Sequence, residues 1–232
     1  MSDQLEGAGF DLYHAFLLLD GSGSMKDKEQ QSGKPKHLAV AEMVQKLINE
    51  LHDRPDINNT QLTVVCYDGV SVDDIRLRDY DVKANMHYNQ ANLDIWDPLR
   101  GHGGTTPIGR ALEVGRELEE RWVNDAQGME NRRGVIYLLS DGMVFPDTES
   151  NGMGERQKIK DFNEEQTKSG SAKGRIRIAT VGYYQFPEGG SPEEDAGREL
   201  LKNLPDNPRA FFQTANASEI TDYIVKTIAA AR

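Results

Sequence analysis

The sequence predicts an α/β fold, in which a doubly wound, mostly parallel sheet of about six strands carries helices on both faces. Continuous apolar runs, such as YHAFLLL at residues 13–19 and VIYLL at residues 135–139, are typical of strands buried on both faces of a sheet. These runs alternate along the chain with segments whose apolar residues recur at helical spacing. No linker, repeat or low-complexity block interrupts the alternation, so we expect one domain over residues 1–232, with a polar tail at residues 1–10.

The segments expected to form strands are either continuously apolar or alternate between apolar and polar residues. In chain order they are residues 13–19, 61–67, 71–77, 135–139, 175–181 and 210–213. The third segment alternates, which is typical of an edge strand with one solvated face.

The segments expected to form helices are recognised by apolar residues at helical spacing or by polar composition between strands. They contain Val40, Val44, Leu47, Ile48 and Leu51; Ile108, Ala111, Leu112, Gly115, Leu118 and Trp122; the polar stretch 155–168; Leu200, Leu201 and Leu204; and Ile220, Tyr223, Ile224 and Ile228. Pro107 fits the first position of the second helix, with Thr106 as its N-cap. Residues 216–219 resemble a capping box before the last helix, and Glu119 with its acidic neighbours indicates a solvated helix face.

The chain is acidic, because 38 aspartates and glutamates outnumber 27 lysines and arginines and give a net charge of -11. Such a chain repels phosphate backbones and anionic lipids, so we expect neither a nucleic acid nor a membrane as its partner. The longest apolar run is too short to span a bilayer, and residues 1–9 contain no apolar signal-peptide core. The single cysteine, Cys66, has no partner for an internal disulfide. We therefore expect a cytoplasmic protein.

Polar side chains follow the buried strands at the places where each strand is expected to end. Asp20-Gly-Ser22-Gly-Ser24 follows the first strand, and Ser140-Asp141-Gly142 follows the VIYLL strand. Gly-Gly-Thr105-Thr106 precedes the helix that begins near Pro107. Ligands of open α/β sheets bind outside the carboxyl ends of the strands, so these carboxylates and hydroxyls are expected to converge on one rim.

Two carboxylates with several neutral hydroxyls form a donor set for a hard cation such as Mg²⁺, which prefers oxygen ligands. Hydroxyls are weak donors, so the cation stays electrophilic and favours an anionic oxygen from outside. Asp20, Ser22 and Ser24 share one side of an extended segment, and the intervening glycines let the loop turn tightly.

Other interpretations of the Asp20 loop fail on the same residues. An EF-hand counted from Asp20 would need Gly and Glu where Met25 and Gln31 stand. An aspartyl phosphotransferase loop would have a second Asp at the position of Ser22, and no Gly-Lys-Ser/Thr of a P-loop is present. A simple turn explains the first motif alone but not its combination with the two others.

Three motifs in order resemble the von Willebrand factor A-type (vWA) family. Asp20-Xaa-Ser22-Xaa-Ser24 resembles its DxSxS signature, and Gly-Gly-Thr105 through Ala-Leu at residues 111–112 resembles its GGT segment. Leu-Leu-Ser-Asp141-Gly resembles a strand end of the family with the pattern (L/I)(L/I)(T/S)DG. The resemblance extends over about residues 13–228 and implies a Rossmann-like fold.

The resemblance also implies a metal-ion-dependent adhesion site (MIDAS). Ser22 and Ser24 would bind Mg²⁺ or Mn²⁺, with Ca²⁺ a further candidate, through their hydroxyls, and Thr105 directly or through water. Asp20 and Asp141 would act mostly through water and hydrogen bonds. An Asp or Glu carboxylate of a partner protein would complete the coordination. Relatives of this acidic, bacterial, cytoplasmic type imply an accessory subunit to an AAA+ ATPase, or a role in a signalling or stress system.

Three functions follow as hypotheses. The first is a non-enzymatic, metal-dependent interaction module. The second is a Mg²⁺-dependent phosphatase or phosphotransferase that uses Asp20, which would need a base or cation at the rim; His102 is the only such residue near the motifs, and no lysine is expected there. The third is a structural domain with a vestigial site. The connections 25–36, 79–100 and 145–154 are longer than is usual in the family and leave the partner open.

Overall fold

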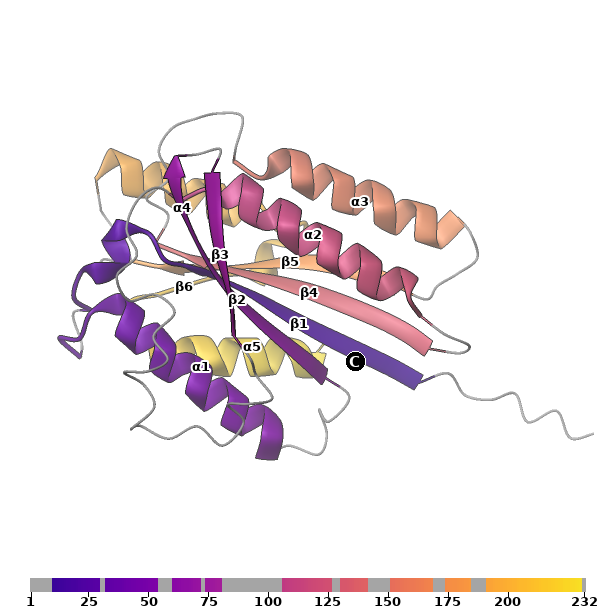
Figure 1. The fold of residues 1–232 in the computed structure, drawn as a ribbon, viewed down its shortest axis with the longest axis horizontal. Coiled ribbons are helices and arrows are strands. Elements are labelled where there is room, and N and C mark those ends of the chain that lie inside the picture. Colours follow the sequence, from indigo (N-terminus) through magenta and orange to yellow (C-terminus); the bar gives the residue numbers. More distant parts are fainter. Residues whose placement is uncertain are drawn as a thin grey trace, which may run out of the picture.

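A computed structural model describes residues 10–29, 32–53, 60–71, 74–80, 106–126, 130–141, 151–168, 174–184 and 191–230. Its centre is one sheet with the strand order β3-β2-β1-β4-β5-β6 (Figure 1). The strands are β1 (Phe10–Asp20), β2 (Thr60–Ser71), β3 (Asp74–Tyr80), β4 (Glu130–Ser140), β5 (Gly174–Tyr183) and β6 (Phe211–Thr214). The parallel part contains five strands rather than six, because β3 runs antiparallel to β2 at the edge. The predicted α/β fold is confirmed.

Helices cover both faces of the sheet (Figure 1). The first face carries α1 (Lys36–Asp53) and α5 (Ala217–Ala230), and the second carries α2 (Ile108–Asn124), α3 (Met153–Lys168) and α4 (Pro192–Asn203). None of the helices within the described ranges is long and apolar enough to cross a membrane.

Two separate cores explain why the first strand reads as one apolar run. Side chains of β1 alternate between the faces, so that Leu17 and Leu19 pack in the core under α1 and α5, whereas Phe16 and Leu18 pack in the core under α2, α3 and α4. All four side chains are at most 1% exposed.

The helix starts differ from the prediction in two places. Helix α2 begins at Ile108, and Pro107, with a ψ of 70°, takes the N-cap position, so Thr106 is not the N-cap. Before α5, the Asn216 side chain accepts from the Ser218 N–H, but the Glu219 carboxylate accepts from Thr214 instead of closing a capping box. A complete capping box opens α4.

The expectation that Glu119 lies on a solvated helix face is wrong. Its side chain is completely buried, and its Oε1 lies 3.1 Å from Nδ1 of His14 in β1. Burial raises the pKa of Glu119. Gly134 in β4 provides the space, because a Cβ atom there would collide with the Glu119 carboxylate. Glu119 follows Gly115 by four positions and precedes Trp122 by three, so helical spacing places it on the apolar side of α2, and the expectation failed because it rested on the charge of the residue.

Candidate metal centre

The two acidic residues predicted for the rim lie at the ends of adjacent strands. Asp20 is the last residue of β1, and Asp141 directly follows β4, whose Leu139 pairs with Leu19. Strand order reverses here, because β1 has β2 on one side and β4 on the other. The site therefore occupies the switch point where doubly wound sheets bind ligands.

Asp20 is fully buried and held at both oxygens. Its Oδ1 accepts from the Ser22 N–H at 2.8 Å, and its Oδ2 accepts from the Ser140 hydroxyl at 2.6 Å. Burial, together with the nearby charge of Asp141, raises the pKa of Asp20 to about 7. Two carboxylates this close and this buried are stabilised by positive charge.

The hydroxyls of Ser22 and Ser24 lie side by side, 3.1 Å apart. They are held by the short 3-10 helix η1 (Gly23–Lys26), in which Met25 is 1% exposed and packs into the core below. The Met25 N–H donates to the Ser22 carbonyl at 3.1 Å. This anchor fixes the two hydroxyls next to Asp20.

A lysine stands at the rim, contrary to the expectation from the sequence. Lys36 Nζ donates to Asp141 Oδ2 at 3.0 Å, and the two side chains are 4% and 2% exposed. The segment before α1 folds back on itself through a bridge between Lys28 and Pro35, and the Lys36 N–H donates to the Asp27 carbonyl at 2.8 Å. The long connection 25–36 thus delivers the first residue of α1 to the rim.

Part of the predicted site lies outside the described residues. This holds for Thr105, for Gly142 and for His102. Thr106 is described and is 3% exposed. The structure thus brings together Asp20, Ser22, Ser24 and Asp141, and the ligand roles of all five residues stay a prediction.

The donor set fits a hard divalent cation. No cluster of three or more Asp, Glu, His or Cys side chains suited to a metal exists among the described residues, so such a cation would depend on the hydroxyls of Ser22 and Ser24 besides Asp20 and Asp141. The buried Tyr67 hydroxyl lies beside Ser140 but hydrogen-bonds to no described residue. An additional oxygen-bearing group, such as metal-bound water, would satisfy it. The Lys36 ammonium already supplies positive charge at Asp141.

Three features of the rim were not found from the sequence. Ser140 orients Asp20, Lys36 neutralises Asp141, and Tyr67 has a pKa raised well above its ordinary value by burial and by the charges of Asp20 and Asp141. Ser140 was expected at the rim as part of the motif that contains Asp141, but its hydrogen bond to Asp20 was not predicted. Lys36 carried no signal, because its position depends on how the preceding segment folds back.

The fold and the rim define a class of protein: α/β domains with a carboxylate-and-hydroxyl site at the switch point of a parallel sheet. The profile of the von Willebrand factor type A domain matches residues 16–226, and the chain belongs to this family. Domains of the family are commonly metal-dependent adhesion or interaction modules. None of the curated protein sequences compared with the chain matches it.

Solved structures share the fold at low sequence identity. Two structures of the pilus adhesin SpaC from Lactobacillus rhamnosus GG, one in an open conformation, have TM-scores of 0.59 and 0.62 at 12% and 14% identity. They match 95% and 94% of this chain and 30% of the adhesin. Proximal thread matrix protein 1 from the mussel byssus, with a zinc-occupied MIDAS motif, has a TM-score of 0.53 at 17% identity, over 95% of this chain and 46% of its own. The chain thus spans less than half the length of each.

Proposed function

We propose that the chain is a metal-dependent protein-binding module and not an enzyme. Ser22, Ser24 and Thr105, with Asp20 and Asp141, would hold Mg²⁺ or Mn²⁺ at the rim. The bound cation would offer an electrophilic coordination position to an Asp or Glu carboxylate of the partner protein. The residues of the chain position that cation and set the charge around it.

The observation that carries this proposal is the arrangement of Asp20, Ser22 and Ser24. The carboxylate is buried and held by hydrogen bonds, and the two hydroxyls lie 3.1 Å apart beside it. A preorganised set of oxygen donors of this kind costs little reorganisation when a cation binds. The zinc-occupied MIDAS motif of the mussel matrix protein supports a divalent metal at the corresponding place in this fold.

A phosphoryl-transfer enzyme is the second candidate, and Lys36 is the observation that favours it. A lysine paired with Asp141 at the rim is the cation that such chemistry needs and that the sequence had not indicated. Two features favour binding instead. Both oxygens of Asp20 accept hydrogen bonds, and its side chain is fully buried, which suits an orienting role better than that of a nucleophile.

The setting is proposed on the family resemblance. The chain would act in the bacterial cytoplasm, as an accessory subunit to an AAA+ ATPase or in a signalling or stress system. Its net charge of -11 favours a protein partner over a nucleic acid or an anionic membrane.

Calorimetric titration with Mg²⁺ and with Mn²⁺ tests the metal site. We expect saturable binding by the intact chain, a loss of at least about tenfold in affinity for Ser22→Ala with Ser24→Ala, and no loss for Ser218→Ala, which removes an exposed hydroxyl on α5. A titration without heat and without metal-induced stabilisation would indicate a vestigial site and contradict the proposal.

Capture of partners from native extract tests the binding step. A partner retained in Mg²⁺, and lost both in EDTA and with Ser22→Ala, is expected. A phosphatase and ATPase screen in Mg²⁺ distinguishes the second candidate, because turnover that Asp20→Ala abolishes would establish an enzyme.

A further inference from the structure

The amino-terminal part of β5, residues 174–179, forms an open edge of the sheet. Strand β6 pairs with β5 only from Thr180 to Tyr183, whereas β4 pairs with β5 from Gly174 onward. Within the described ranges, no strand lies beside residues 174–179 of β5 on the β6 side. This edge is remote from the metal centre along the strand, because the rim lies at the carboxyl ends of the strands.

A side chain of α3 shows which main-chain groups of β5 point outward at this edge. The Asn163 amide donates to the Ile176 carbonyl at 2.8 Å and accepts from the Ile176 N–H at 2.9 Å, which are the bonds that a neighbouring strand would make. The polar groups of alternate residues point the same way, so those of Ile178 also face this side. Asn163 therefore occupies one pairing position and leaves the next one open.

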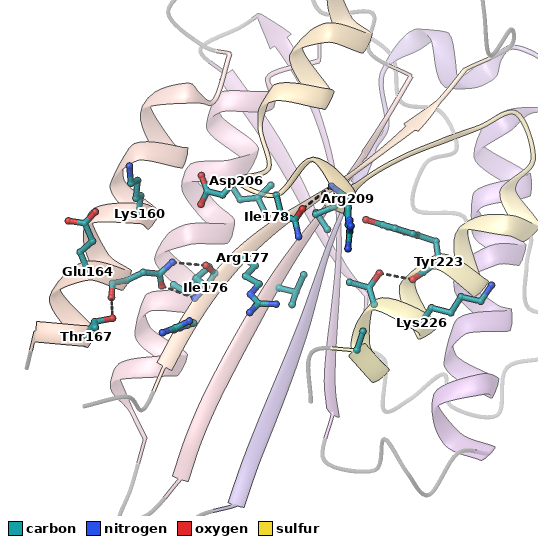
Figure 2. Close-up of a pocket in the computed structure, with 18 of the residues that line it drawn as sticks. Lys160, Glu164, Thr167, Ile176, Arg177, Ile178, Asp206, Arg209, Tyr223 and Lys226 are labelled. Atoms are coloured by element: carbon teal, nitrogen blue, oxygen red, sulfur yellow. Dashed lines mark hydrogen bonds between the residues drawn. The ribbon is translucent and has the colours of Figure 1, made fainter. Parts of the chain in front are cut away.

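A groove with a volume of about 1020 Å³ follows this edge. Figure 2 shows α3 with Lys160 and Glu164 on one side, α5 with Tyr223 and Lys226 on the other, and Ile176 to Ile178 of β5 between them. Its volume is at the upper end of the range of about 300–1,000 Å³ that small-molecule pockets span. Because Asn163 occupies the pairing position of Ile176, the open part of the edge is centred on Ile178. A segment beside residues 177–179 would be roughly 10 Å long, at about 3.3 Å per residue.

The groove is basic, although the chain as a whole is acidic. Its lining contains two carboxylates and six cations, Lys160, Lys168, Arg175, Arg177, Arg209 and Lys226. All six cationic side chains are exposed, and none forms an ion pair or hydrogen bond with another described residue. Of the two carboxylates, Asp206 is already paired with Arg156 at 3.0 Å. The unpaired positive charge thus lies along the open strand edge.

We propose that this groove binds an acidic protein segment in extended conformation, which adds to β5 as a further strand beside Ile178. The segment would form main-chain hydrogen bonds with β5, and its alternate side chains would meet the cations on the two sides of the sheet. Arg175 and Arg177 lie on the face of α5, because their neighbours Ile176 and Ile178 face the core under α3. Acidic residues at alternate positions would therefore meet both arginines.

A single-stranded nucleic acid fits the groove less well. Such ligands use aromatic side chains on which bases stack, and Tyr223, the one aromatic residue in the described lining, is already stacked on Phe212 with ring centroids 4.8 Å apart. A free strand edge, in contrast, offers a donor and an acceptor from the same residue, which an extended peptide backbone matches and a phosphodiester backbone without N–H groups does not.

The test is a fluorescence anisotropy titration of the full chain with capped, labelled peptides. The probe alternates glutamate and valine; one control peptide has proline at the central positions, and another has lysine for glutamate. We expect binding of the first peptide only, in EDTA as well as in Mg²⁺, with protection of the Ile178 amide from hydrogen exchange. Proline removes the N–H that pairing needs.

Charge reversal locates the site. The double variant Arg175→Glu with Arg177→Glu is expected to weaken peptide binding on the order of tenfold. The double variant Lys160→Glu with Lys226→Glu should weaken it by a similar factor. The matched control is Arg121→Glu with Lys202→Glu, which makes the same charge change at exposed positions outside the groove. Equal weakening by the control, equal binding of the proline peptide, or no binding at millimolar peptide would each overturn the proposal. So would binding of an oligothymidylate in place of the peptide.

Discussion

The ammonium group of Lys36 lies 3.0 Å from a carboxylate oxygen of Asp141, although the two residues are 105 positions apart and both are almost completely buried. The ion pair joins the first residue of α1 to the loop after β4. It leaves the rim with two carboxylates and one internal cation. Lys36 therefore determines both the stability of the site without metal and the charge that an incoming cation meets.

Replacing Lys36 with methionine should affect these two properties in opposite directions. Without metal, Lys36→Met leaves Asp141 buried without its cation, and the free energy of unfolding should fall by about 3–5 kcal/mol. The affinity for Mn²⁺ should rise, because one positive charge and one competitor for Asp141 are gone. Urea denaturation in EDTA and calorimetry with Mn²⁺ measure the two effects.

Lys34→Met is the matched control for this substitution. Lys34 pairs with Glu42 on the surface, where the side chains are 46% and 38% exposed, so its loss should change stability by less than about 1 kcal/mol. Weaker Mn²⁺ binding by Lys36→Met would contradict a competing role and would mean that Lys36 mainly orients Asp141.

The stability of the metal-free chain should depend on pH through Asp20. Its pKa rises from the ordinary 3.8 to about 7 in the folded protein, so the folded state binds this proton more tightly than the unfolded chain does. The resulting stabilisation is fully present below pH 3.8 and is lost as the pH rises through about 7. Denaturation in EDTA across this window, compared with Asp20→Asn, isolates the contribution. A wild type that gains stability relative to Asp20→Asn as the pH rises would refute it.

Glu29 should be a strong contributor to stability near the metal loop. Its carboxylate accepts from the Tyr183 hydroxyl at 2.7 Å and from the Ala217 N–H at 2.9 Å, which connects the loop to β5 and to the start of α5. Burial opposes its ionisation, but hydrogen bonds from Ser32, Tyr183 and Ala217 hold its pKa below the ordinary value. Glu29→Ala leaves a buried hydroxyl without its acceptor and should cost about 2–4 kcal/mol in urea denaturation.

Glu42→Ala provides the comparison, since Glu42 is paired only on the surface and should cost less than about 1 kcal/mol. The Glu29 contribution should be fully present above the ordinary pKa of 4.5 and should be lost as the pH falls below 4.5 through the lowered pKa of the folded state, because only there does the unfolded chain bind the proton more tightly. Equal losses for the two alanine variants would contradict this role.

Two glycines at the start of α3 should respond to alanine with opposite signs. Gly152 has a φ of +80°, and a Cβ atom there would lie 2.5 Å from Leu112 Cδ1, so Gly152→Ala should destabilise the chain by about 1–3 kcal/mol. Gly154 is exposed in the helix with no atom near its Cβ position, so Gly154→Ala should stabilise by about 0.5–1 kcal/mol. Thermal denaturation of both variants measures the two effects. A change of the melting temperature with the same sign in both variants would count against this explanation.

Local patterns determined most of the fold. The continuous apolar runs of β1 and β4 predict strands buried on both faces, because such strands have no solvated side, and the structure confirms them between two helical layers. The predicted carboxylates of Asp20 and Asp141 come together for the same reason, since each follows a buried strand and parallel strands end at one rim. Strand and helix boundaries shifted by a few residues, as caps depend on single hydrogen bonds.

The tertiary structure alone decided which charged groups face each other. Lys36 reaches Asp141 only because the segment before α1 folds back through Lys28 and Pro35, and Glu119 is buried only because Gly134 leaves room above the sheet. The basic groove depends in the same way on where β6 begins relative to β5. Hydrophobic periodicity specifies which side of an element is buried. The charge of a site depends on contacts between residues distant in sequence, and no local pattern records those.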